Sequence, residues 1–396
     1  MQIQNGSRTP AASRIALPSF IPALDGLRGV AIIAVLLFHL DFPGCSLGWA
    51  GVELFFVISG FLITRILLNT RDNRNYFSNF YYRRTLRIFP IYYLVITIYA
   101  AVKLFSSGDS LRNLPFYYLY LQTIPQLQSH FREMPMLGHT WSLAIEEQFY
   151  LIWPMAVFLL RGRKLFVMIS MMIITGLGVR FYALEFANPF LIDGWLGVQV
   201  DALAAGAIVA YGLRVSDRQV MQRSVLAAFL LGTLSLVGLV SIAGTTVFWT
   251  PIIWSRLWYS PLVLTAMACA FAGAVGLAAI GHRWTRWLEF SPLMRWGKIS
   301  YGIYLFHPFV FYLIDIIARQ IDHPKSRLVS GSLMLVKLSL TYLLARISWI
   351  LIEGPINGLK DRFSKRAERQ NGASEMLMTG KDQQISKSIE QTASPG

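Results

Sequence analysis

The chain has 396 residues, of which 55% are hydrophobic and only 14% are charged, and its formal net charge is +15. Soluble domains carry about 25% charged residues, so this composition excludes an ordinary soluble protein and indicates an all-α, polytopic integral membrane protein. We attribute the positive charge to cytoplasmic loops and expect no nucleic-acid partner. The two cysteines, Cys45 and Cys269, are too few for a disulfide framework or a zinc site, and we expect no metal.

The order of polar and apolar stretches predicts three parts. Residues 1–20 lack the apolar core of a signal peptide and are expected to form a cytoplasmic N-terminal segment. Residues 361–396 are polar, rich in Ser, Gln and Lys, and predict a disordered cytoplasmic tail. The transmembrane domain, residues 21–360, contains about ten segments long enough to cross a hydrocarbon core of about 30 Å. They lie near residues 24–41, 49–68, 88–106, 141–161, 164–184, 195–213, 224–243, 257–281, 299–320 and 329–354.

Lysine and arginine concentrate on alternate loops of this arrangement. The loops between the basic ones carry few such residues, and the basic stretches are 69–87, 161–164, 214–223, 282–298 and the residues after 354. Because basic loops stay in the cytoplasm, this asymmetry predicts that the N-terminus and the C-terminus are both cytoplasmic.

The first apolar segment, LDGLRGVAIIAVLLFHL at residues 24–40, contains Arg28 and His39. These residues are 11 positions apart, so in a helix they share one face and are separated by roughly 16 Å along the axis. Ionisable residues inside a membrane are rare and usually functional. Two simpler interpretations stay open: Arg28 pairs locally with Asp25, and His39 belongs to a helix end at the aromatic belt.

Four acidic residues are predicted at the depth of His39, in the outer part of the membrane. They are Glu53, Glu146, Glu147 and Asp201. Because Glu146 and Glu147 are adjacent, their side chains diverge by ~100° and we expect one of them to meet the histidine. His307 precedes Pro308, so it either accompanies a helix kink or contacts substrate.

The stretch YYRRTLRIFPIYY places Arg83, Arg84 and Arg87 on the cytoplasmic side, just before the third predicted span. Arg83 and Arg87 are four residues apart and are predicted to share a face. Such a cluster either binds anionic lipid head groups or forms a phosphate-binding site, because the guanidinium fork matches phosphate geometry.

Several stretches occur in the order typical of one family. They are LDGLRGVAIIAVLLFH, GVELFFVISGFLI, RRTLRIFP, HTWSLAIEEQFYL, ISYGIYLFHPFV and SWILIEGPI, which together cover about residues 20 to 360. In these motifs the chain resembles the membrane acyltransferase-3 family, bacterial enzymes that O-acylate surface and exported carbohydrates. The resemblance implies an O-acyltransferase, with O-acetylation as the expected reaction.

The resemblance also implies functional positions and a donor. The donor would be cytoplasmic acetyl-CoA or another acyl-CoA, bound by Arg28, Arg83, Arg84 and Arg87. We expect His39, assisted by Glu147 or Glu146, to act as a general base or to carry the acyl group transiently. The residues expected to contact the acceptor are Glu53, Trp141, Ser142, Asp201 and His307, although Trp141 is also typical of the aromatic belt.

The implied acceptor is a carbohydrate or glycolipid, such as exopolysaccharide or lipopolysaccharide, and the implied location is the bacterial inner membrane. Membrane lipids and glycan-assembly proteins are the expected partners. Two other classes compete with this interpretation. A transporter or flippase of a glycan or acyl precursor would also need buried ionisable residues, but we find no inverted repeat. A non-catalytic membrane scaffold would leave the acidic residues around His39 unexplained.

Overall fold

A computed structural model describes residues 15, 17–106, 111–124, 134–185, 196–243, 260–320 and 327–359. Within these residues the regular structure is helical and contains no strand. The predicted tail 361–396 and most of the predicted N-terminal segment 1–20 lie outside the described residues.

All ten predicted transmembrane segments are helical where the structure describes them. The long helices are α1 (Pro22–His39), α2 (Ala50–Thr70), α3 (Tyr76–Ser106), α5 (Trp141–Leu159), α6 (Arg163–Glu185), α8 (Leu196–Val215), α9 (Arg218–Ala243), α10 (Ser260–Ala279), α12 (Ser300–Gln320) and α13 (Arg327–Ser348). The shorter elements are η1 (Ser46–Trp49), α4 (Leu114–Tyr118), η3 (Gly138–Thr140), η6 (Arg283–Glu289), α11 (Ser291–Lys298) and η7 (Trp349–Glu353).

Nine of the described helices are long and apolar enough to cross a membrane. Helix α5 is the predicted span that is not among them, although its 19 residues are sufficient in length. Its mean hydropathy is lowered by Glu146, Glu147 and Gln148. The fold class, a polytopic all-α membrane protein, is confirmed.

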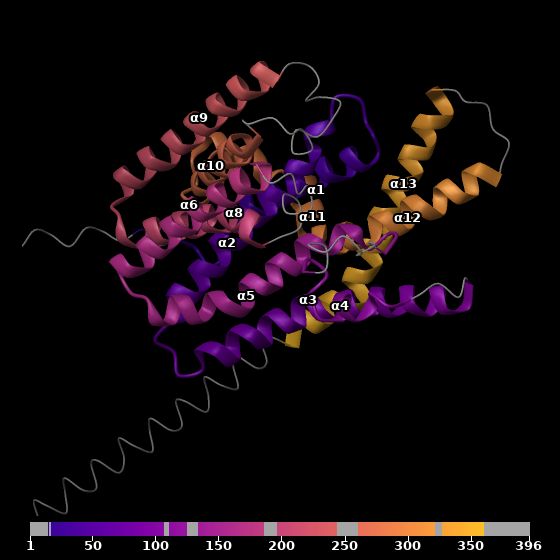
Figure 1. Ribbon diagram of the computed structural model, residues 1–396, viewed down its shortest axis with the longest axis horizontal. Helices are drawn as coiled ribbons and strands as arrows, with labels where there is room; N and C mark the ends of the chain where they lie inside the picture. Colours follow the sequence, from indigo (N-terminus) through magenta and orange to yellow (C-terminus); the bar gives the residue numbers. More distant parts are fainter. Residues whose placement is uncertain are drawn as a thin grey trace, which may run out of the picture.

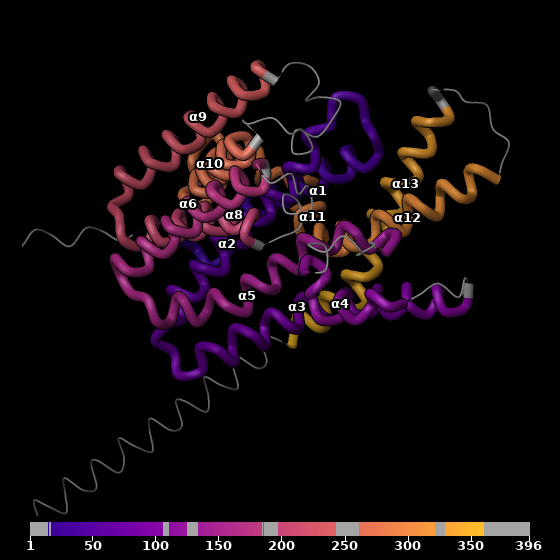
Figure 2. Tube along the Cα trace, viewed as in Figure 1, coloured from indigo at the N-terminus to yellow at the C-terminus, as the bar shows by residue number. Residues whose placement is uncertain are grey.

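Helix α1 connects two groups of helices (Figure 1). Its first half, including Leu24 and Leu27, belongs to a hydrophobic core shared with α2, α5, α8 and α10. Its second half, including Val35 and Leu36, belongs to a second core shared with α3, α4 and α12. Helices α12 and α13 lie side by side at the edge of the molecule opposite α9 (Figure 2). The residues on α1 therefore lie where the two groups meet.

Glycines bring α2 and α8 into backbone contact. A Cβ atom on Gly60 would overlap the carbonyl oxygen of Leu203, and one on Gly206 would overlap the carbonyl oxygen of Val57. Small residues permit this close approach between membrane helices, where van der Waals packing drives association.

The start of α1 is packed in the same way on the connection between α10 and α12. A Cβ atom on Gly26 would overlap the carbonyl oxygen of Leu288 in η6, and one on Gly29 would overlap that of Leu293 in α11. Gly297 of α11 approaches the α1 backbone equally closely. The two glycines of the LDGLRG motif therefore set the position of the helix that carries Arg28.

Candidate active site

A cavity of about 90 Å³ lies where α1, α2, α3, α5 and α12 meet. Its charged lining comes from Arg28, Arg84, Arg87 and Glu146, and its hydroxyl groups include those of Ser59, Ser142, Tyr150, Tyr301 and Tyr304. Helix α2 supplies an apolar wall of Val52, Phe55, Phe56, Ile58 and Leu62. The structure thus brings several predicted site residues together around one space.

Arg28 both pairs with Asp25 and lines the cavity. Its Nη1 lies 2.5 Å from Asp25 Oδ1 in an ion pair of which each side chain is 15% exposed. The same side chain lines the cavity and lies close enough to Arg87 for the two charges to repel. The local pairing with Asp25 therefore orients Arg28 instead of removing it from the site.

Arg84 and Arg87 provide the other two cationic groups. The Arg84 guanidinium lies 5.1 Å from the centroid of the Tyr150 ring, a cation–π contact. Arg83 is exposed and does not line the cavity, so Arg84 and Arg87, three residues apart, are the α3 pair that faces it. Arg28 and Arg84 lie near Tyr150, which is eight residues, or roughly 12 Å, along α5 from Ser142.

Glu146 and Glu147 point in different directions, as their adjacency predicts. Ser59 Oγ donates a hydrogen bond to Glu146 Oε1 at 2.5 Å, and Glu146 lines the cavity. Glu147 does not line it, and its Oε1 is buried with no hydrogen-bond partner among the described residues. Next to them, Gln148 Nε2 donates to the Tyr120 carbonyl at 2.9 Å. The acidic part of α5 therefore packs against α2 and the segment after α4.

His39 is the last residue of α1, and it is exposed. Its Nδ1 lies 2.9 Å from the carbonyl oxygen of Val35. Because a carbonyl can only accept, Nδ1 carries the hydrogen and Nε2 carries the lone pair of a base. The Val35 carbonyl thus orients the His39 ring. Glu146, which was predicted to assist His39, is hydrogen-bonded to Ser59 instead.

The neighbours of His39 are two further histidines. The ring centroids of His39 and His307 are 4.8 Å apart, and those of His307 and His139 are 5.3 Å apart. Burial lowers the pKa of His139, which precedes α5 in η3, to about 3, so this ring is neutral. We call these three residues the imidazole cluster. Among the described residues, no group of acidic, histidine or cysteine side chains has the arrangement of a metal site.

Tyr304 joins the imidazole cluster to the cavity. Its hydroxyl lies 2.7 Å from Ser142 Oγ and donates to the His139 carbonyl at 2.7 Å, while its own carbonyl accepts from His307 Nδ1 at 2.7 Å. Ser142 and Tyr304 both line the cavity. Sequence reasoning missed His139 and Tyr304, although both lie inside quoted motifs, HTWSLAIEEQFYL and ISYGIYLFHPFV.

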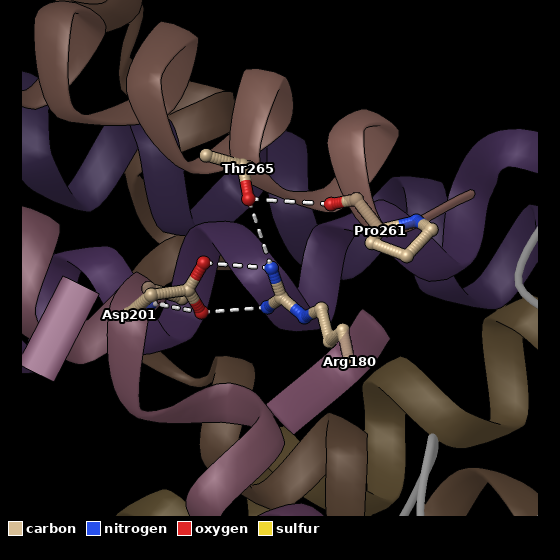
Figure 3. Close-up of polar contacts among 5 residues, drawn as sticks. Arg180, Asp201, Pro261 and Thr265 are labelled. Atoms are coloured by element: carbon tan, nitrogen blue, oxygen red, sulfur yellow. Dashed lines mark hydrogen bonds and ion pairs between the residues drawn. The ribbon is translucent and has the colours of Figure 1, made fainter. Parts of the chain in front are cut away.

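Asp201 lies in a different polar cluster, formed with Arg180 of α6 (Figure 3). Arg180 donates to both carboxylate oxygens of Asp201, at 2.6 and 2.7 Å, and to the Thr265 hydroxyl at 3.2 Å. Both charged side chains are 1% exposed. Glu53 is also buried and is close enough to this pair to interact electrostatically. Arg180 was missed, although an arginine within an apolar segment is itself a signal.

The predicted acceptor contacts therefore occupy different places. Ser142 lines the cavity, His307 belongs to the imidazole cluster, and Glu53 and Asp201 lie with Arg180. Trp141 is half-buried at the start of α5, and its ring centroid lies 6.0 Å from that of Phe56.

Comparison with known proteins identifies the family. A family model described as an acyltransferase domain matches residues 21–346. The chain is 28% identical over 373 residues to the peptidoglycan O-acetyltransferase OatA of Listeria monocytogenes, covering 87% of this chain and 57% of the relative. It is 28% identical over 362 residues to the O-acetyltransferase OatA of Staphylococcus aureus, with coverages of 86% and 57%.

The chain thus spans a little over half the length of these curated relatives. No solved structure matches it significantly. The family match covers most of the chain and includes the cavity, the three arginines that line it and the imidazole cluster, so the chain belongs to the membrane acyltransferase-3 family.

Proposed function

We propose that this protein is a membrane O-acetyltransferase that moves an acetyl group from acetyl-CoA to a hydroxyl of a cell-surface or exported carbohydrate. The observation that carries the proposal is one cavity lined both by three arginines and by Ser142 and Tyr304, the hydroxyl pair that contacts the imidazole cluster. The names of the relatives, O-acetyltransferases of peptidoglycan, support a carbohydrate acceptor.

The arginines suit the phosphates of a coenzyme A thioester. Guanidinium groups bind phosphate through two parallel hydrogen bonds, and Arg28, Arg84 and Arg87 all face the cavity. A cavity of about 90 Å³ is smaller than the ~150 Å³ that accommodates benzene, so it suits an acetyl group better than a long acyl chain. The nucleotide part of the donor then lies outside the cavity, at its cationic side.

His39 is the group suited to activate the acceptor. Its Nε2 lone pair takes the proton of the acceptor hydroxyl while the hydroxyl oxygen attacks the acyl carbonyl carbon. In direct transfer the new C–O bond forms as the C–S bond breaks, and the departing thiolate receives the proton from the imidazolium. In stepwise transfer His39 Nε2 first takes the acyl group as the C–S bond breaks. The acceptor oxygen then attacks the acyl carbon, the C–N bond breaks, and the freed Nε2 takes the hydroxyl proton and passes it to the thiolate. Glu146, which accepts a hydrogen bond from Ser59, lies beside the arginines.

The basic loops support an inner-membrane orientation with both chain ends in the cytoplasm and the donor arriving from that side. The exposed His39 then serves an acceptor on the outer side, with glycan-assembly proteins and lipids as neighbours. A transporter or flippase is the competing class, because buried ionisable groups also mark transport pathways.

The test uses purified protein in lipid vesicles supplied with acetyl-CoA labelled in the acetyl group, together with peptidoglycan fragments or N-acetylglucosamine oligosaccharides. The expected product is a labelled ester on the carbohydrate, detected by mass spectrometry. His39→Asn should abolish it, whereas His282→Asn, a histidine that caps η6 outside the cavity, should not. Carbohydrate that crosses the vesicle membrane without gaining an ester would favour the transporter.

A further inference from the structure

We infer that the imidazole cluster is the binding site for the acceptor sugar, in which His139 donates to the reacting oxygen, His39 takes its proton and His307 accepts from a second hydroxyl of the same sugar. The inference rests on the proposed function and goes beyond it, because it assigns acceptor recognition to a histidine that motif analysis did not single out.

The first step is the hydrogen-bonding state of His307. Its Nδ1 lies 2.7 Å from the Tyr304 carbonyl and therefore carries the hydrogen, which leaves a lone pair on Nε2. The residue is 0% exposed, and Nε2 has no hydrogen-bond partner among the described residues. A buried acceptor without a partner is unfavourable, and native structures seldom leave one unexplained.

His139 presents the complementary group. Both of its ring nitrogens are buried and make no well-formed hydrogen bond within the part of the chain that the structure describes. The backbone of Met136 and of Leu305 comes near the ring without meeting hydrogen-bonding geometry. A neutral imidazole has one N–H and one lone pair, so this ring can donate to a ligand oxygen as well as accept from it.

These groups match an alcohol. One hydroxyl donates a single hydrogen bond, so it satisfies only one of the two lone pairs, on His39 Nε2 or His307 Nε2, while it accepts from an N–H of His139. A second hydroxyl of the same sugar supplies the donor for the other lone pair. In these tautomers an anion would meet a single donor, on His139. The described residues here also lack a metal-ligand arrangement. Two neighbouring hydroxyls of a carbohydrate therefore match all three rings.

The cluster is exposed on one side, at His39, and contacts Tyr304 on the other. His39 is exposed, so the acceptor can reach the cluster past this ring. On the opposite side, the Tyr304 ring centroid lies 5.3 Å from that of His139 and 5.7 Å from that of His307. Tyr304 also lines the cavity where the donor is proposed to bind. A hydroxyl held by the cluster thus has the base on its exposed side and the donor cavity beyond Tyr304.

The test separates the two nitrogens of His307. His307→Asn keeps an N–H at the position that bonds the Tyr304 carbonyl and removes the ε nitrogen, whereas His307→Gln keeps a polar group at the ε position. With N-acetylglucosamine oligosaccharides as acceptor, we expect His307→Asn to raise the acceptor KM about tenfold, equivalent to about 1.4 kcal/mol, with the acetyl-CoA KM unchanged. His307→Gln should recover part of this loss.

A second variant, His139→Phe, keeps an aromatic ring against Tyr304 and removes both nitrogens. It should also raise the acceptor KM with the acetyl-CoA KM unchanged. A wild-type acceptor KM in both His307→Asn and His139→Phe would overturn the inference, because the rings would then be structural. Equal changes in both KM values would overturn it as well. If the wild-type protein transfers no acetyl group to carbohydrate, both the proposed function and this inference are refuted. If the wild-type protein is active and the variants keep its acceptor KM, only this inference is refuted.

Discussion

Replacing Asp201 with alanine should destabilise the folded protein by about 3–5 kcal/mol, the cost of leaving a buried charge without its partner. Arg180 donates to Asp201 at 2.6 and 2.7 Å, and both side chains are 1% exposed, so water cannot replace the lost carboxylate. The Thr265 hydroxyl, 3.2 Å from Arg180 Nη1, is neutral and does not compensate. Replacing both charged residues, as in Arg180→Met/Asp201→Leu, should recover most of the loss.

Thermal unfolding in detergent, followed by the loss of monodisperse protein, measures this effect. At about 2 °C per kcal/mol, the midpoint of the Asp201→Ala variant should fall by roughly 6–10 °C. Asp315→Ala is the matched control, because its 2.7 Å ion pair with Lys337 is 45% exposed on the aspartate side and should contribute only about 0–1 kcal/mol. If Asp201→Ala unfolds at the temperature of the control, the structural role is refuted. If Asp201→Asn instead raises the acceptor KM without a stability change, Asp201 binds substrate.

Three further predictions concern the cavity and the packing around it. Arg84→Ala should raise the KM for acetyl-CoA about 10- to 100-fold, because it removes a charge-assisted hydrogen bond of about 1.5–3 kcal/mol. An unchanged KM for acetyl-CoA in steady-state assays would exclude Arg84 from donor binding. Gly60→Val should yield little monodisperse protein on size-exclusion chromatography, because its side chain would overlap the Leu203 carbonyl, whereas Gly178→Val, with open surroundings, should behave as wild type. His39→Asn should lower kcat by about 10²–10⁴-fold while equilibrium binding of acetyl-CoA persists; weakened binding would place His39 in the donor site instead.

Length and hydropathy sufficed to predict the helices, because both are properties of each segment alone. Each of the ten predicted segments overlaps one described helix, and Asp25 and Arg28 pair as their spacing allows. The start of the third segment was wrong: α3 begins at Tyr76, not near residue 88, so Arg83, Arg84 and Arg87 lie within the helix instead of before it. The divergence of Glu146 and Glu147 also follows from the helical repeat, and one of them lines the cavity.

Contacts between helices could not be predicted in the same way. Counting residues gives the depth of a side chain in the membrane, but its partner depends on the rotation of the helix and on which helices are neighbours. Asp201 and His39 were predicted at one depth, yet Asp201 faces Arg180 of α6 while His39 faces His307 of α12. His139 lies in a 3-10 turn before α5, outside every predicted span, so an argument based on spans did not consider it.

The glycine contacts at the start of α1 restrict how this protein can work. An interface of long side chains can slide by changing rotamers, but Gly26 and Gly29 place backbone directly against the carbonyls of Leu288 and Leu293, with no soft torsion to absorb a shift. These contacts hold the helix that carries Arg28 and His39 in a fixed position. Under the proposed function, the acyl group therefore moves past a fixed helix, in contrast to transporters in which one helix bundle rocks against another to move a binding site across the bilayer.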